Sequence, residues 1–195
     1  MAINWGNSVM IMAMLLAVTY VAGSVNFSIL LFRFLGKDDP RRHFSRNAGV
    51  TNVYRQAGFF WSGVILLLDT GRAMLIAWVA LYLLPMHYAP WIGLALIIGN
   101  RFPCFHRFQG GKGVASYLGF TIVMAPFWAA ISALLWVVVY AIFRIPFVAS
   151  LFMIATLMVG TIIACGYQWT AIAGAIVTVL FIFYNHRENW KRVKG

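Results

Sequence analysis

Seven apolar stretches, separated by short connections, constrain this chain more than any other feature. They fall at residues 8–33, 59–84, 88–103, 113–126, 127–143, 147–165 and 167–184. With 63% hydrophobic and only 10% charged residues in 195 positions, the chain lies outside the range of soluble globular proteins. Roughly 20 apolar residues cross a bilayer as a helix. We therefore predict an all-α integral membrane protein with seven transmembrane helices, and a single domain over residues 1–195.

Two points about these stretches need comment: whether the fourth and fifth are separate helices, and whether the first is a signal peptide. The fourth and fifth stretches are parted only by Pro126, so one bent span could replace two helices there. The first stretch lacks a basic leader and a small-residue cleavage site, and it runs past the length of a signal-peptide core. We therefore expect it to be a span and not a cleaved signal.

The distribution of the 15 Lys and Arg residues predicts the orientation. The connections after the second, fourth and sixth stretches contain no Lys or Arg, whereas the other connections and the tail hold nearly all of them. Basic residues favour the cytoplasmic side, which places the C-terminus inside and, with seven spans, the N-terminus outside. The basic cytoplasmic face is expected to meet membrane lipids or anionic substrates.

A glycine-rich stretch, Gln109-Gly110-Gly111-Lys112-Gly113, lies between two apolar runs and precedes an expected helix. Glycines allow backbone N–H groups to approach an oxyanion, and the lysine and the helix N-terminus add positive charge. This pattern indicates a phosphate cradle, although glycine-rich turns between membrane helices are also common. It is not a nucleotide P-loop, because His106 and Gly113 occupy positions that require Gly and Ser or Thr.

The first connection, residues 36–55, is long for so compact a membrane protein, and long connections are commonly functional. It ends with Thr51 and Arg55, which share a face if this part is helical. Its hydroxyl, amide and guanidinium groups suit a phosphate or glycerol hydroxyls, but a capping turn in a positively charged loop explains the same residues equally well.

Several polar residues elsewhere need an explanation. Asp69 and Arg72 lie deep in the second stretch at a spacing that permits an ion pair, so we expect both to face the bundle interior. Gly23 indicates close helix packing, and Asn26 is able to bond a neighbouring backbone. The two cysteines, at opposite ends of their spans, are too far apart for a disulfide, and no cluster with metal-ligand spacing occurs.

Three motifs together resemble the acyl-phosphate:glycerol-3-phosphate acyltransferases, the PlsY family of bacterial membrane enzymes. The family's Gly-Ser-Gly-Asn-x-Gly-Ala-Thr-Asn, with a following Arg, looks like residues 44–52 and Arg55. Its Lys-Gly-Gly-Lys-Gly-Val-Ala matches residues 109–115, and its His-Arg-Glu-Asn matches residues 186–189. The motifs occur in the family's order, and the resemblance extends from Gly23 to Asn189.

The resemblance implies a seven-helix enzyme of the bacterial inner membrane, with a cytoplasmic site that transfers an acyl group from acyl phosphate to the 1-hydroxyl of glycerol 3-phosphate. The products are lysophosphatidate and phosphate, as in the first step of phospholipid synthesis, and no acyl-enzyme serine, cofactor or metal is expected. By motif position the catalytic residues are Ser45, Arg55, Lys112, Ser150, His186 and Asn189. The substrate-binding residues are Asn47, Thr51, Asn52, Gly110, Gly111 and Gly113.

The expected partners are acyl phosphate, glycerol 3-phosphate and membrane lipids, with no nucleic acid, and the site is expected within a monomer. The departures from the family pattern include Asn26, Arg46, Arg72, Asn100 and Gln109. An organic-phosphate transporter is the alternative, since the same basic groups would bind a passing anion. The absence of a clear internal repeat and of charge in the outer connections disfavours it.

Overall fold

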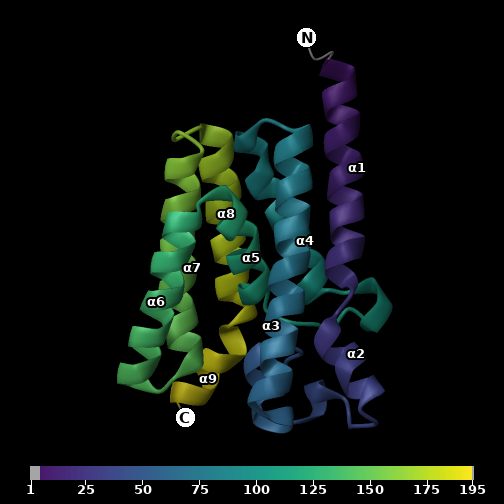
Figure 1. Ribbon diagram of the computed structural model, residues 1–195, viewed down its shortest axis with the longest axis vertical. Helices are drawn as coiled ribbons and strands as arrows, with labels where there is room; N and C mark the ends of the chain where they lie inside the picture. Colours follow the sequence, from purple (N-terminus) through teal and green to yellow (C-terminus); the bar gives the residue numbers. More distant parts are fainter. Residues whose placement is uncertain (1–4, 195) are drawn as a thin grey trace.

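A computed structural model describes residues 5–194 and shows helices packed side by side in a bundle (Figure 1). In chain order the helices are α1 (Trp5–Ser24), α2 (Phe27–Phe34), α3 (Val50–Leu83), α4 (Ala89–Arg101), α5 (Val114–Met124), α6 (Pro126–Phe143), α7 (Pro146–Ala164), α8 (Trp169–Asn185) and α9 (Arg187–Lys194). Three 3-10 turns lie between them: η1 (Pro40–Arg42), η2 (Met86–Tyr88) and η3 (Cys104–His106). No strand occurs within residues 5–194, which confirms the all-α prediction.

Each predicted apolar stretch contains a helix, and α5 and α6 are separate helices that meet at Ala125, directly before Pro126. Four helical regions are long and apolar enough to cross a membrane: Val9–Phe34, Val50–Leu83, Pro126–Phe143 and Pro146–Ala164. Helices α5 and α8 are apolar but shorter. Large apolar side chains project outward, among them Phe59 at 82% exposure and Leu67 at 72%. Such a surface suits lipid as its solvent.

The first stretch is not one continuous helix as expected, because it breaks between α1 and α2. Asn26 caps α2 by accepting a hydrogen bond from Ile29 N at 3.1 Å, and its Nδ2 donates to Ala48 O at 3.3 Å. Arg72 of α3 donates to the carbonyl groups of Ala22 and Val25 at the break. These contacts satisfy backbone groups that the missing helical turn leaves unpaired.

Arg72 is held in place by the predicted ion pair. Its Nη2 lies 3.1 Å from Asp69 Oδ1, and both side chains are less than one tenth exposed. The same nitrogen lies 3.3 Å from Ser116 Oγ on α5. The pair therefore faces the bundle interior, as expected, and joins α3 to the α1–α2 break and to α5.

Close packing of α1 against α4 depends on two glycines. A Cβ atom on Gly23 would collide with the backbone of Leu96, and one on Gly99 would collide with the backbone of Tyr20. This confirms the packing role predicted for Gly23. The two helices can approach this closely only because neither glycine carries a side chain.

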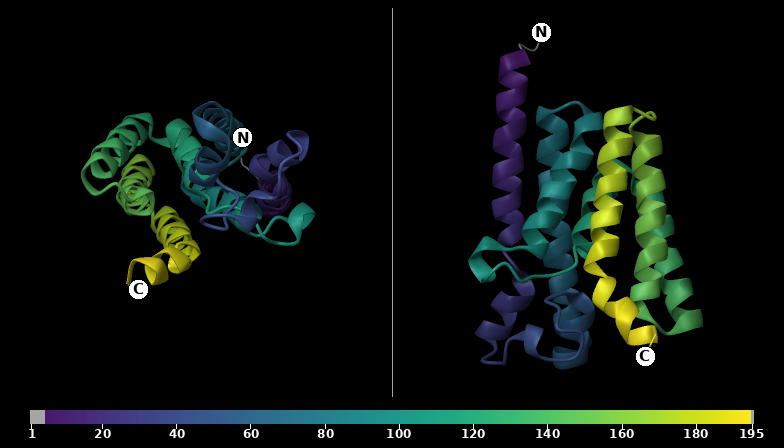
Figure 2. Two further views of the ribbon diagram at one scale, coloured as in Figure 1. Left: turned by 90° about the horizontal axis from the view of Figure 1, so that it is seen from below. Right: turned by 180° about the vertical axis from the view of Figure 1, so that it is seen from behind.

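Helix α3 has a break at Gly58, where φ is 86° and ψ is −177°. The break separates a first part that carries Thr51, Asn52 and Arg55 from the apolar part that begins at residue 59. In Figures 1 and 2, one end of the bundle holds the first part of α3, η1, α2 and the C-terminal α9, and the start of α1 lies at the other end. The motif residues of the first connection and of the chain end therefore share one end of the molecule.

Candidate active site

Asn52 organises the first connection. Its Nδ2 donates to Pro40 O at 2.7 Å and to Asn47 O at 2.8 Å, and its Oδ1 accepts from Ser45 N at 3.3 Å. The side chain is 1% exposed. Its hydrogen-bonding groups are thus engaged with the loop backbone, so Asn52 positions Ser45 and Asn47 and does not present its own amide to solvent.

The backbone conformation at two positions of this connection accounts for two glycines of the family motif. Phe44 has a φ of 50° and Arg46 a φ of 54°, which is the left-handed region that glycine occupies without strain. The motif has glycine at both positions. In this chain Phe44 and Arg46 adopt this conformation with larger side chains, in the loop whose backbone Asn52 binds.

The glycine-rich stretch differs from the predicted cradle. Gly110 N donates to Arg101 O at 3.1 Å and Gly111 N to Asn100 O at 2.9 Å, so these two N–H groups are not directed at an anion. Side chains at Gly110 or Gly111 would collide with Asn100, and one at Gly113 with Ile97. The glycines are required by close packing against the end of α4. Anion-binding groups that remain here are Lys112 and the first turn of α5.

Lys112 is fixed next to the end of α8 through Asn185. The amide Nδ2 of Asn185 donates to Lys112 O at 3.4 Å, while its Oδ1 accepts from Arg101 Nε at 3.2 Å. Asn185 is 4% exposed and directly precedes His186. One buried amide therefore joins the end of α4, the glycine-rich stretch and the third motif.

His186 is 3% exposed and uncharged at neutral pH. Burial, and secondarily the positive charge of Lys112, lowers the pKa of its imidazole from 6.5 to about 3. Asn189 Nδ2 lies 3.2 Å from His186 Nδ1. With this amide as donor, the imidazole proton lies on Nε2, an atom that is buried with no hydrogen-bond partner among the described residues. Such an atom is suited to a ligand.

Ser150 is 9% exposed on α7. Its hydroxyl donates to Pro146 O at 3.0 Å and accepts from Trp136 Nε1 on α6 at 3.2 Å. Phe147, one turn earlier, lies against His186 with ring centroids 6.3 Å apart. The packing of α7 on the third motif thus places Ser150 on the same side of the bundle as His186.

Arg55 is exposed and borders a pocket of about 340 Å³. The other lining residues are Phe32, Lys37, Asp38, His43, Phe44 and Gln56. None of the remaining candidate catalytic residues lines this pocket. Thr51, in the first turn of α3, is also exposed. Lys112 is therefore joined to the third motif through Asn185, and Asn189 contacts His186, whereas Arg55 borders a separate pocket in the first connection.

Both cysteines are free, as predicted: Cys104 is exposed and Cys165 is buried. Within the described residues no group of three or more His, Cys, Asp or Glu side chains is arranged to hold a metal ion. The available chemistry is that of cations and neutral hydrogen-bond donors, which suits phosphate groups.

Comparison with known proteins shows the family to which this chain belongs. A family model described as glycerol-3-phosphate acyltransferase matches residues 13–195. The chain belongs to the glycerol-3-phosphate acyltransferase family. The acyltransferase of Methylobacillus flagellatus is 34% identical over 93% of this chain and 92% of its own length. That of Myxococcus xanthus is 37% identical over 89% and 91%.

Solved structures of this acyltransferase family agree with the fold. The crystal structure of PlsY, an integral membrane glycerol 3-phosphate acyltransferase, in its glycerol 3-phosphate form has a TM-score of 0.86 at 30% identity, and the match covers 93% of this chain and 91% of that one. The lysophosphatidic acid form has a TM-score of 0.84 at 29% identity over the same shares. The glycerol-3-phosphate acyltransferase resemblance predicted from the motifs is confirmed.

Sequence reasoning missed the residues that hold the acyltransferase motifs together. Asn185, Arg101 and Trp136 were not singled out, although Asn185 directly precedes His186. A polar residue at the end of an apolar stretch was the available signal, but its partners are 73 and 84 residues away in the sequence. Only the fold identifies which motif such a residue contacts.

Proposed function

We propose that this protein transfers a fatty acyl group from acyl phosphate to the 1-hydroxyl of glycerol 3-phosphate. The observation that carries the proposal is the pairing of Lys112 with a neutral, buried His186 whose Nε2 has no partner among residues 5–194. A cation beside an unused N–H donor suits a phosphate oxygen or a developing oxyanion. Membership of the acyltransferase family supplies the substrate class.

The reaction needs no covalent enzyme intermediate. The hydroxyl oxygen of glycerol 3-phosphate attacks the acyl carbon, the bond between that carbon and the phosphate oxygen breaks, and inorganic phosphate leaves. A substrate phosphate accepts the hydroxyl proton. Because acyl phosphate is already activated, the main task of the protein is to hold two mutually repelling anions in a reactive geometry.

We assign roles within that task. Lys112 and Arg55 balance phosphate charge, while His186 Nε2–H and the Ser45 hydroxyl donate hydrogen bonds to phosphate or the oxyanion. The Ser150 hydroxyl would join them as a donor only by releasing its hydrogen bond to Pro146 O. Asn189 fixes the His186 tautomer. The remaining proposed substrate contacts come from the first connection, residues 36–55, and the first turn of α5. They involve Asn47 and Thr51 side chains, with Asn52, Gly110, Gly111 and Gly113 shaping the walls.

We also infer that the bundle crosses a bacterial inner membrane seven times, as one domain and as a monomer, with the N-terminus outside. The three shorter helices α4, α5 and α8 would complete the set of crossings, with much of α4 buried inside the bundle. The site would then face the cytoplasm, at the end of the bundle that holds the basic first connection. Reporter fusions at the C-terminus and in the connection near Pro85 should show opposite sides; the same side for both would exclude this topology.

The enzymatic proposal is tested with purified protein in lipid nanodiscs. With acyl phosphate and glycerol 3-phosphate we expect release of inorganic phosphate together with an equal amount of lysophosphatidate, measured by mass spectrometry. Acyl-CoA offered in place of acyl phosphate tests the donor and should give no product. Lys112→Ala should abolish turnover while the protein elutes as a folded species. Absence of both products from the wild-type protein would exclude the function.

A further inference from the structure

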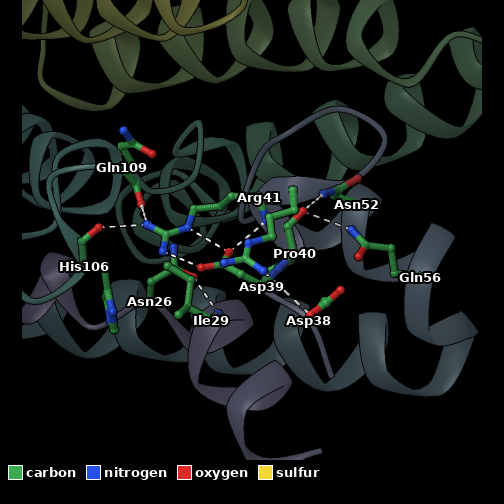
Figure 3. Close-up of polar contacts among 11 residues, drawn as sticks. Asn26, Ile29, Asp38, Asp39, Pro40, Arg41, Asn52, Gln56, His106 and Gln109 are labelled. Atoms are coloured by element: carbon green, nitrogen blue, oxygen red, sulfur yellow. Dashed lines mark hydrogen bonds and ion pairs between the residues drawn. The ribbon is translucent and has the colours of Figure 1, made fainter. Parts of the chain in front are cut away.

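Arg41 lies in η1 and bonds residues far along the chain (Figure 3). Its Nη1 donates to His106 O at 2.8 Å and to Gln109 O at 2.7 Å. The two acceptors bracket the turn that leads into the glycine-rich stretch. The Arg41 side chain thus joins the first connection directly to the chain segment that precedes Lys112.

Asp39 orients the guanidinium group. Its Oδ2 lies 2.5 Å from Arg41 Nη2, and its Oδ1 accepts from Arg41 Nε at 2.8 Å and from the Arg41 backbone N at 2.9 Å. The hydrogen bond from the Arg41 side chain is the main cause of a lowered pKa of the Asp39 carboxyl. A planar guanidinium paired on one edge in this way presents its remaining nitrogen in a fixed direction.

The turn that receives Arg41 has an unusual backbone. Arg107 and Phe108 both have positive φ, at 56° and 53°, in a region that residues other than glycine rarely occupy. Arg41 bonds the carbonyl group on each side of this pair. Such a strained turn persists when surrounding contacts determine its shape, and Arg41 supplies two of them.

The other side of the same loop is fixed to α3. Pro40 O accepts from Asn52 Nδ2 at 2.7 Å and from Gln56 Nε2 at 3.1 Å. Figure 3 shows Pro40 and Arg41 between these α3 residues and the carbonyl groups of His106 and Gln109. The first connection is therefore bound on one side to the helix that carries Arg55 and on the other side to the segment that carries Lys112.

We propose that Arg41 is a positioning residue. It sets the distance between the first connection, which leads into the helix that carries Arg55, and the segment that carries Lys112 in the acyl-transfer site. This rests on the proposed function. Arg41 need not touch substrate, because its Nε, Nη1 and Nη2 are all engaged with protein acceptors. A further hydrogen bond between the two segments, from the Ala48 backbone N to Gly110 O, is long at 3.4 Å. Loss of Arg41 should therefore increase the mobility of the first connection relative to the segment that carries Lys112.

The test compares Arg41→Gln and Arg41→Lys with Arg42→Gln in nanodiscs. Arg42 follows in the same turn, but its side chain is 72% exposed and its ion pair with Asp38 is long, at 3.9 Å. We expect Arg41→Gln to raise KM for glycerol 3-phosphate about tenfold, with KM for acyl phosphate changed by less than about twofold. Arg41→Lys should give an intermediate KM, because an ammonium keeps the charge but not the fork geometry. Arg42→Gln should match the wild type.

Hydrogen-exchange mass spectrometry supplies a readout that does not depend on activity. In Arg41→Gln, peptides covering residues 38–49 and residues 104–113 should both exchange faster, and neither should change in Arg42→Gln. Faster exchange in only one of the two peptides, or a fall in kcat with both KM values unchanged, would overturn the positioning role. If the wild-type protein has no acyl transfer activity, the proposed function fails while the exchange data still test the bond between the two segments.

Discussion

Nδ2 of Asn189 lies 3.2 Å from Nδ1 of His186, one helical turn earlier, and this contact decides which imidazole nitrogen carries the proton. The amide occupies Nδ1, so the proton and the free donor capacity are on Nε2. Because burial keeps the ring neutral, the role proposed for His186 is that of a hydrogen-bond donor and not of a cation. The charge in this part of the site comes from Lys112.

Removing the Asn189 amide should therefore reduce the preference of His186 for the Nε2–H tautomer and leave the fold intact. We expect Asn189→Ala to lower kcat/KM about 10- to 100-fold, the range for a lost hydrogen bond at a reacting centre. Asn189→Asp, nearly identical in shape, should lose at least as much, because a carboxylate accepts from Nδ1–H and leaves Nε2 without its proton. Steady-state kinetics measures both, and wild-type kcat/KM in Asn189→Asp would contradict the tautomer assignment.

The lowered pKa of His186 predicts a pH dependence of stability. The folded pKa of about 3 lies below the ordinary value of 6.5, so below about pH 6.5 the unfolded chain binds a proton that the folded chain excludes. This contribution to stability is present above the unfolded pKa and decreases as the pH falls from about 6.5 towards 3. Thermal unfolding in detergent at several pH values measures it.

Lys112→Met separates the two causes of that pKa. Without the Lys112 charge, the pKa of His186 should rise but stay below 6.5, because burial is the larger cause. Nuclear magnetic resonance of labelled histidine follows the titration of His186. An unchanged His186 titration in the variant would show that the ammonium does not act on the ring.

The Asp69–Arg72 pair should be strongly coupled in stability. Arg72→Met leaves the Asp69 carboxylate buried without its partner and removes donors from the α1–α2 break, so we expect a loss of about 3 kcal/mol or more. The double variant Asp69→Asn, Arg72→Met should be less destabilised than Arg72→Met alone. Unfolding midpoints in detergent give the double-mutant cycle, and simple additivity would contradict the pairing.

Arg46→Gly should stabilise the first connection. Arg46 is exposed and has a φ of 54°, so glycine relieves a left-handed conformation that costs roughly 1–2 kcal/mol in other residues. Glycine also adds freedom to the unfolded chain, which leaves a net gain of about 1 kcal/mol or less. Arg42→Gly, at a position without positive φ, is the matched control and should destabilise. A lower unfolding midpoint in Arg46→Gly than in Arg42→Gly would contradict the strain argument.

The sequence predicted much of the site but misjudged how its glycines work. The family resemblance predicted Lys112, His186 and Asn189 as site residues, and the structure places Lys112 and Asn189 near His186. The same reasoning predicted that Gly110 and Gly111 offer N–H groups to an anion, whereas they donate to Arg101 and Asn100. Glycine is selected both by ligand contact and by close packing, and the residue type alone does not distinguish these two causes.

By itself, the sequence determined the all-α membrane architecture, because apolar length and the distribution of charge are local properties of the chain. It also determined the chemical groups of the site, since phosphate needs cations and hydrogen-bond donors. Only the tertiary structure decided that Asn185 joins Lys112 to the third motif and that Arg41 joins the first connection to the turn at residues 106–109. These bonds span 65 or more residues, and their partners are backbone carbonyl groups, which every residue has and no sequence pattern singles out.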